Sequence, residues 1–256
     1  MARNAADRLC RAVLFDLDDT LIATSRIDRA AILKAARGRS DVAAKFAALL
    51  KAQPFPALAG LSVPVWRASL WACALAPDGE EPSVQKAGDA AQRAHDHWVS
   101  ERLAHFKFPE PVRALVGRLQ AAGYVTGILT NGPSVVQRAK VEACGAAALF
   151  GEDRVVLAGE LAEQKPAASA FRAACAALGE PPERTIMVGD SYAADIAGGI
   201  GSGMLATVWV HPPEAADASL GSVAHDFVAH VPHGQPAPDH TIPSVLELEA
   251  VLERIG

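Results

Sequence analysis

Two aspartates spaced two apart, Asp16 and Asp18, directly follow an apolar run at residues 13–15. Side chains alternate along a strand, so both carboxylates can leave the strand end on one side, about 6 to 7 Å apart. Carboxylates this close repel, and each raises the pKa of the other unless a cation lies between them. The pair therefore predicts a site for a divalent cation and a phosphoryl group. A turn that is merely acidic is the alternative, because Asp-Asp-Thr is also ordinary turn composition.

A second segment carries chemistry that matches the first. Residues 124–129 predict a buried strand that runs into Thr130 and Asn131. There a hydroxyl and free backbone N–H groups precede a helix, and such a helix start favours an anion. This segment is therefore expected to bind a phosphate group.

The remaining charged candidates follow a third strand and precede a helix. Residues 185–188 predict the strand, and Asp190 and Asp195 come after it. Lys165 stands just before a helix predicted from about residue 167, and it supplies a cation where the acidic groups would gather. In open α/β sheets, ligands bind at the carboxyl ends of the strands. We therefore expect all these side chains at one edge of one sheet.

The elements that must position these residues alternate along the chain. The expected strands lie at residues 11–16, 124–129, 154–158, 185–188 and 204–210, and helices separate them. This alternation predicts an α/β fold with a doubly wound parallel sheet. Between the first two strands, helical spacing recurs in several separate segments, which predicts an all-helical insert. The expected domains are a catalytic core of residues 1–22 and 108–256, and a helical domain of residues 23–107.

The chain resembles the haloacid dehalogenase (HAD) superfamily of hydrolases, whose four motifs occur here in order. The first motif, DxDxT, stands at residues 16–20, the second is Thr130, the third is Lys165, and the fourth is Asp190 with Asp195. The resemblance implies a Rossmann-like core, and the helical insert looks like the C1-type cap of the superfamily. Segments at 137–144, 187–190, 195–199, 206–210 and 244–248 further resemble the N-acylneuraminate-9-phosphatase-like and nucleotidase-like subgroup.

The resemblance also implies roles for the motif residues. Asp16 is the expected nucleophile, which forms an aspartyl-phosphate, and Asp18 is the expected general acid and base. The hydroxyl of Thr130, the backbone of Asn131 and the ammonium of Lys165 are expected to bind the phosphate. Mg²⁺ is the expected cofactor, held by Asp16, the backbone carbonyl of Asp18, and Asp190. Asp195 is the expected outer-shell or water-mediated ligand.

The predicted activity is Mg²⁺-dependent hydrolysis of a small phosphorylated metabolite such as a sugar phosphate or nucleotide. A phosphomutase or phosphotransferase would keep the same catalytic set and is the first alternative. A 2-haloacid dehalogenase is less favoured, because its leaving halide needs no proton and Asp18 would have no task. A phosphate-binding protein without turnover is the non-enzyme alternative. The substrate and the oligomeric state are not predicted.

Composition is that of a globular enzyme. The 256 residues are 50% hydrophobic, and the net charge of −5 gives no reason to expect a nucleic-acid or membrane partner. The four scattered cysteines are expected to be buried free thiols in a reducing cytoplasm, and we expect no export or membrane-spanning segment. Residues 211–243 are rich in histidine and proline and are expected to form an irregular loop. Tryptophans 66, 71 and 98 could face a substrate, but a place in the core of the helical domain is favoured.

Overall fold

The computed structural model describes residues 8–53, 60–77, 88–212 and 230–256, and the chain forms two compact units. The sheet unit comprises Met1–Ala23 and Lys107–Gly256, and the helical unit comprises Thr24–Phe106. Each unit is described by itself below. Among the described helices, none combines the length and the apolar character that crossing a bilayer requires.

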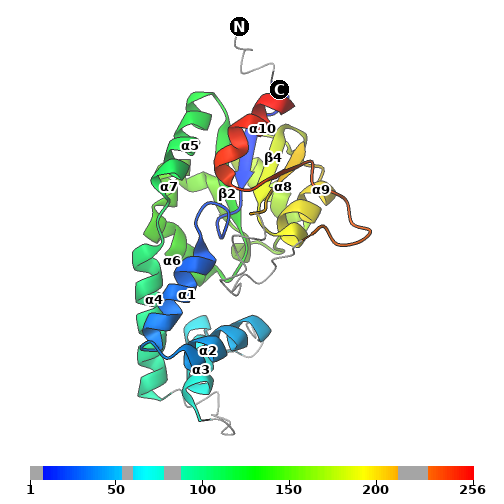
Figure 1. Ribbon diagram of the computed structural model, residues 1–256. Coiled ribbons are helices and arrows are strands. Elements are labelled where there is room, and N and C mark those ends of the chain that lie inside the picture. Colours follow the sequence, from blue (N-terminus) through cyan, green and yellow to red (C-terminus); the bar gives the residue numbers. More distant parts are fainter. Residues whose placement is uncertain (1–7, 54–59, 78–87, 213–229) are drawn as a thin grey trace. The chain divides into compact units, whose positions relative to one another are not determined.

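The described part of the sheet unit contains six parallel strands in the order β3-β2-β1-β4-β5-β6 (Figure 1). Their bounds are β1 Ala12–Phe15, β2 Val125–Thr130, β3 Val155–Leu157, β4 Thr185–Gly189, β5 Ala206–Val210 and β6 His240–Ile242. β1 lies at the centre, with Phe15 opposite Ile128 of β2 and Val188 of β4. All four residues of β1 are buried, as expected for a parallel strand that is covered on both faces.

Helices cover both faces of this sheet. Leu14 packs with Phe171 of α8 in one buried cluster, whereas Phe15 points to the other face and meets Phe150 of α7, with ring centroids 6.2 Å apart. In the described part of this unit, the helices are α5 Glu110–Ala121, α6 Ser134–Cys144, α7 Ala146–Phe150, α8 Ala168–Leu178, a π-helix at Tyr192–Ala197, α9 Gly198–Gly201 and α10 Leu248–Ile255. Short 3₁₀ turns lie at Glu152–Arg154, Ala158–Glu160, Pro182–Arg184 and Val245–Glu247. The predicted doubly wound parallel sheet is confirmed.

The expected irregular loop at residues 211–243 is wrong at its C-terminal end. His240–Ile242 forms β6, which pairs in parallel with Val208–Val210 at the edge of the sheet. Asp239, just before β6, accepts hydrogen bonds from the backbone N–H and the hydroxyl of Thr207, at 2.8 and 3.0 Å. The strand is therefore fixed by its neighbour rather than by its own composition. Residues 213–229 of the predicted loop lie outside the described residues.

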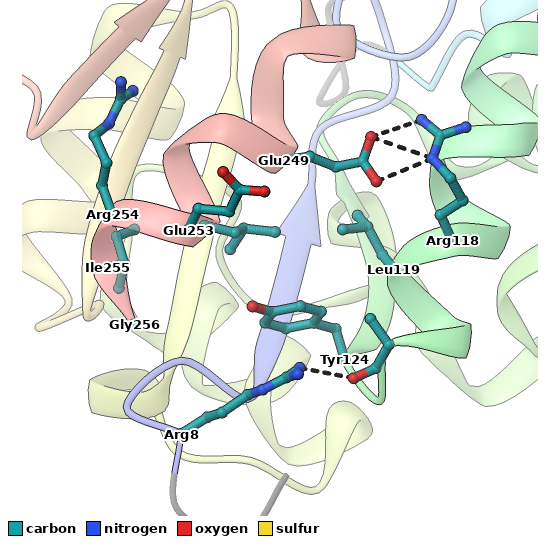
Figure 2. A pocket seen from close by; sticks show the side chains of 11 residues that line it. Arg8, Arg118, Leu119, Tyr124, Glu249, Glu253, Arg254, Ile255 and Gly256 are labelled. Atoms are coloured by element: carbon teal, nitrogen blue, oxygen red, sulfur yellow. Dashed lines mark hydrogen bonds and ion pairs between the residues drawn. The ribbon is translucent and has the colours of Figure 1, made fainter. Parts of the chain in front are cut away.

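A cavity of about 810 Å³ opens in the sheet unit at the amino ends of the strands. Figure 2 shows Arg118 of α5 and Glu249 of α10 at its rim, joined by hydrogen bonds of 2.7 to 3.2 Å. Arg8, which precedes β1, donates to the carbonyl of Ala122 at 2.7 Å and lies over the ring of Tyr124. The predicted site residues lie at the opposite, carboxyl ends of the strands, so this cavity is separate from them.

The described part of the helical unit consists of four helices. Their bounds are α1 Thr24–Ala35, α2 Ser40–Ala52, α3 Val63–Leu75 and α4 Asp89–His105. Phe46 stacks on Trp71 at 3.9 Å between ring centroids and meets Trp98 edge-on at 5.2 Å. Trp66, Trp71 and Trp98 are all buried, so their expected place in the core of this domain is confirmed. A buried ion pair between Arg102 of α4 and Asp28 of α1 joins the two ends of the unit's sequence.

Cysteine burial agrees with the sequence interpretation at three of four positions. Cys10, Cys144 and Cys175 are buried free thiols, whereas Cys73 in α3 is half-buried. Burial raises the pKa of the Cys144 thiol to about 11. Such thiols stay protonated near neutral pH and are poor nucleophiles.

Candidate active site

Three adjacent strands end at or just before polar side chains that were predicted to form the site. Asp16 follows β1, Thr130 is the last residue of β2, and Asp190 follows β4. The strands are parallel and β1 lies between the other two, so their carboxyl ends meet at one edge of the sheet. The backbone N–H of Asp16 donates to the carbonyl of Val188 at 2.9 Å, which extends the pairing of β1 and β4 up to the site.

Lys165 joins two of the carboxylates in the interior of the sheet unit. Its ammonium lies 2.5 Å from Oδ1 of Asp16 and 2.7 Å from Oδ1 of Asp195. The lysine side chain is only 1% exposed. Burial acts to lower the pKa of this lysine, but the charges of Asp16 and Asp195 outweigh it and hold the pKa above the usual value. Lys165 is therefore a permanent cation at this site.

Asp16, Asp190 and Asp195 form a carboxylate cluster whose candidate ligand oxygens lie within 4.8 Å of one another. Burial raises the pKa of Asp16 to about 7, Lys165 acts against that rise, and Asp195 and Asp18 add to it. Burial, followed by the charges of Asp16 and Asp195, also raises the pKa of Asp190 well above its usual range. The ammonium of Lys165 pairs with two of these three carboxylates, and a divalent cation would balance the remaining negative charge. A donor set made only of oxygen suits a hard cation.

Hydrogen bonds from neighbouring groups hold Asp195 and Asp190 in place. Oδ2 of Asp195 accepts the backbone N–H of Ser191 at 3.0 Å, and the side chain of Asp195 is fully buried. A Cβ on Gly189 would lie 2.2 Å from the same Oδ2, so only glycine at this position leaves room for Asp195. The Thr20 hydroxyl donates to Oδ1 of Asp190 at 3.2 Å. Thr20 belongs to the first sequence motif, and its contact with Asp190 was not predicted.

Asp18 has partners that sequence reasoning missed. The ammonium of Lys140 lies 2.7 Å from both carboxylate oxygens of Asp18, and the side-chain amide of Gln137 donates to Oδ2 at 2.9 Å. Gln137 and Lys140 are three apart on α6 and therefore share one helix face. That spacing, in a helix that begins just after the second motif, was the available signal.

Thr130 and Asn131 present different chemistry to the site. The Thr130 hydroxyl is buried and has no hydrogen-bond partner among the described residues. Leaving such a group unsatisfied costs about 1 to 3 kcal/mol, so the geometry suits a donor that waits for a ligand oxygen. The Asn131 side chain instead holds Lys165: its amide donates to the Lys165 carbonyl at 2.8 Å, and its oxygen accepts the Lys165 N–H at 3.0 Å. Both polar atoms of the Asn131 side chain thus hold the backbone of Lys165.

Glycines let two loops approach each other beside Thr130. Gly132 has a φ of +122°, which L side chains rarely adopt, and its N–H donates to the side chain of Gln164 at 2.8 Å. A Cβ on Gly159 would lie 2.1 Å from the carbonyl oxygen of Gly132. The segment before Lys165 can therefore pack closely against the segment after Thr130, since residues 132 and 159 are both glycine.

Two protein-family profiles match the chain. The sequence profile of the haloacid dehalogenase-like hydrolases matches residues 10–203, and the profile described as HAD-hydrolase-like matches residues 163–248. The chain belongs to the haloacid dehalogenase-like hydrolase family. The superfamily resemblance inferred from the four motifs is thereby confirmed.

Relatives of this HAD-family chain include several phosphatases. It is 32% identical over 260 residues to the N-acylneuraminate-9-phosphatases of Rattus norvegicus and Homo sapiens, which covers 96% of this chain and 94% of each relative. It is 29% identical over 179 residues to a phosphoglycolate phosphatase of Cereibacter sphaeroides, covering 70% of this chain and 76% of the relative. The family and these relatives identify the chain as an enzyme, a phosphoric monoester hydrolase.

A solved structure confirms the HAD fold. The magnesium-bound HAD-hydrolase YfnB of Bacillus subtilis aligns with a TM-score of 0.65 at 20% identity, over 96% of this chain and 99% of that one. At this identity the likeness concerns the fold alone.

Proposed function

We propose that this HAD-family enzyme hydrolyses small phosphate monoesters with Mg²⁺, through an aspartyl-phosphate on Asp16. One observation supports the proposal most: Asp16 shares a buried site with Lys165, Asp190 and Asp195, beside the unpartnered hydroxyl of Thr130. Phosphate monoesters resist attack because their oxygens are negatively charged, so a catalyst must supply cations and hydrogen-bond donors around an aligned nucleophile.

In the first step, a carboxylate oxygen of Asp16 attacks phosphorus while the bond to the ester oxygen breaks. Asp18 gives its proton to the departing alkoxide. In the second step, Asp18 takes a proton from water, which attacks phosphorus and breaks the bond to Asp16. Inorganic phosphate leaves, and both aspartates return to their starting states. General acid–base assistance of this kind typically contributes about 10²- to 10⁴-fold.

The cations and donors of the site fit these steps. Lys165 stays protonated and offsets charge on Asp16 and the phosphoryl oxygens, and the Thr130 hydroxyl donates to one of those oxygens. Asp16, Asp190 and the backbone carbonyl of Asp18 would hold Mg²⁺, with Asp195 in or next to its ligand shell. When bound, Mg²⁺ supplies positive charge that favours both the ionised form of Asp16 and the phosphoryl group.

We assign Thr24–Phe106 the role of a cap that limits substrate size and excludes bulk water. Two features support this: these residues form a compact helical unit of their own, and it is inserted between the first and second motifs. Residues 21–24 and 109–111 would be its hinges. Lids of this kind exclude water from the reacting groups.

For the substrate class, we propose a phosphorylated sugar acid or similar metabolite, with N-acylneuraminate 9-phosphate as the first candidate. The alignment to N-acylneuraminate-9-phosphatases supports it, because 96% coverage includes the helical unit as well as the sheet unit. Relatives named for pyrimidine nucleotides and phosphoglycolate match only 49% and 70% of the chain. Nucleotides and phosphoglycolate are therefore the next candidates.

The test is phosphate release from p-nitrophenyl phosphate by the full-length protein, with Mg²⁺ and after treatment with a chelator. The proposal expects turnover that needs Mg²⁺ and is absent in Asp16→Asn. Lack of turnover by the wild type would overturn it. Free inorganic phosphate as product also separates hydrolysis from phosphomutase chemistry, which transfers the group instead. A screen of acylneuraminate phosphates, nucleotides and phosphoglycolate then ranks the substrates by kcat/KM.

A further inference from the structure

Lys140 makes a part-buried ion pair with the aspartate assigned to proton transfer. Its side chain is only 5% exposed, and its ammonium lies 2.7 Å from each oxygen of Asp18. Gln137, one helical turn earlier, adds a donor at 2.9 Å to Oδ2 and also donates to the Asn131 carbonyl. Side chains of helix α6 thus bind both carboxylate oxygens of Asp18 and the backbone carbonyl of the residue that follows Thr130.

Stability alone does not account for this arrangement. A buried ion pair loses so much hydration that apolar residues of similar volume are often as stabilising or more so. Arg138 on the same helix shows the ordinary alternative, because it pairs with Glu160 at the surface, where both side chains are largely exposed. The chain instead places a buried ammonium on one of the few carboxylates whose orientation would decide a proton transfer.

We propose that Lys140, supported by Gln137, is a positioning residue that holds the Asp18 carboxylate in the orientation it needs to exchange a proton with the ester oxygen and with water. This inference rests on the proposed function. Asp18 lies just past the end of β1, where it forms an isolated bridge with Ile22, and its side chain is 26% exposed, so the backbone alone leaves that side chain room to rotate. A misplacement of about 1 Å in a reacting group can cost about 100-fold in rate.

The test is a double-mutant cycle of Lys140→Met and Asp18→Asn in the Mg²⁺-loaded enzyme, with phenyl phosphate as substrate. Lys140→Met alone is expected to lower kcat by about 100-fold with little change in KM. The double variant is expected to be no slower than Asp18→Asn, because the lysine acts only through that carboxylate. Arg138→Met, which removes the same charge from the exposed side of α6, is the control and is expected to keep wild-type kcat.

Leaving-group dependence adds a readout that a purely structural role would not move. Lys140→Met should lose more activity on an alkyl phosphate than on p-nitrophenyl phosphate, as Asp18→Asn should, because the aryl leaving group needs little protonation. Equal losses on both substrates, or losses that multiply in the double variant, would overturn the positioning role. If Lys140→Met fails to fold, Gln137→Leu enters the same cycle and is judged by the same criteria.

A crystal structure of Lys140→Met separates this inference from the proposed function. The Asp18 carboxylate is expected to leave the position it occupies in the wild type. An unchanged Asp18 carboxylate would refute the inference even in an active enzyme. Absence of phosphatase activity in the wild type would instead refute the proposed function, and the crystallographic comparison would still decide whether Lys140 holds Asp18.

Discussion

Replacing Asp16 by asparagine is expected to abolish turnover and at the same time to stabilise the metal-free protein. Asparagine keeps an oxygen that can accept from Lys165, now 2.5 Å from Oδ1 of Asp16, but it removes one of three crowded carboxylates. Metal-free wild type must ionise this buried group at neutral pH, and the variant need not. If Asp16 is the nucleophile, as proposed, the ionised carboxylate that the reaction needs lowers the stability of the metal-free protein.

The size of the expected gain in stability follows from the pKa of Asp16. Burial raises it from 3.8 to about 7 in the folded chain, a difference of about three. At 1.36 kcal/mol per pKa unit, the cost to the folded state above pH 7 is about 4 kcal/mol. Because relaxation of the site absorbs part of this cost, the measured gain in Asp16→Asn should fall between about 1 and 4 kcal/mol.

Because the folded-state pKa of Asp16 is raised, its effect on stability changes between about pH 4 and pH 7. Below the unfolded pKa near 3.8, Asp16 is protonated in both states and contributes nothing. As the pH rises towards 7, the unfolded chain ionises Asp16 freely while the folded chain retains the proton, so wild-type stability falls. Above pH 7 the loss is complete and constant. The advantage of Asp16→Asn should therefore be less than half as large at pH 5 as at pH 8.

Urea unfolding of wild type and Asp16→Asn at pH 5 and pH 8, in the presence of a chelator, measures this directly. Adding Mg²⁺ at pH 8 should narrow the difference in stability, because a bound ion at 100 times its Kd stabilises the native state by about 2.7 kcal/mol and the variant lacks one of the proposed Mg²⁺ ligands. A variant less stable than wild type at pH 8 without metal would refute the reasoning. An advantage of equal size at both pH values would also refute it.

Two further substitutions test the remaining roles. Asp18→Asn should lower kcat by several orders of magnitude on an alkyl phosphate but by far less on p-nitrophenyl phosphate, and equal losses in steady-state kinetics would contradict its role as the acid. Thr130→Val is nearly isosteric and removes the unpartnered hydroxyl. Inhibition by inorganic phosphate should therefore weaken by about 10- to 100-fold, as expected for the loss of a hydrogen bond to a charged group. An unchanged inhibition constant would show that this hydroxyl does not contact phosphate.

Much of the fold and part of the site could be predicted from the sequence, for an identifiable reason. Parallel strands end together, so locating apolar runs before Asp16, Thr130 and Asp190 is enough to bring those residues to one edge. The helical insert was indicated by several successive segments of helical spacing between the first two strands, and four helices, α1 to α4, are found in the described part of that stretch. β6 was not predicted, because a three-residue strand rich in polar groups is defined by its pairing with β5 and not by its own composition.

The contacts between side chains could not be predicted in the same way. Lys140 meets Asp18 across 122 positions of sequence, and that contact depends on how α6 is rotated about its own axis. The backbone of Asn131 was expected to help bind the phosphate, but the sequence did not indicate that the side chain of Asn131 holds the backbone of Lys165. Sequence pattern shows which elements meet, but the packing of helices and loops decides which polar atoms pair.

The central claim is that Asp16 forms a covalent bond to phosphorus. Acid quenching of Mg²⁺-loaded enzyme during turnover of a phosphate monoester, followed by mass spectrometry of the peptide that contains residues 12–25, tests this directly. We expect that peptide to carry one added phosphoryl group in the wild type and none in Asp16→Asn. A phosphoryl group on another residue, or full turnover by Asp16→Asn, would contradict the account.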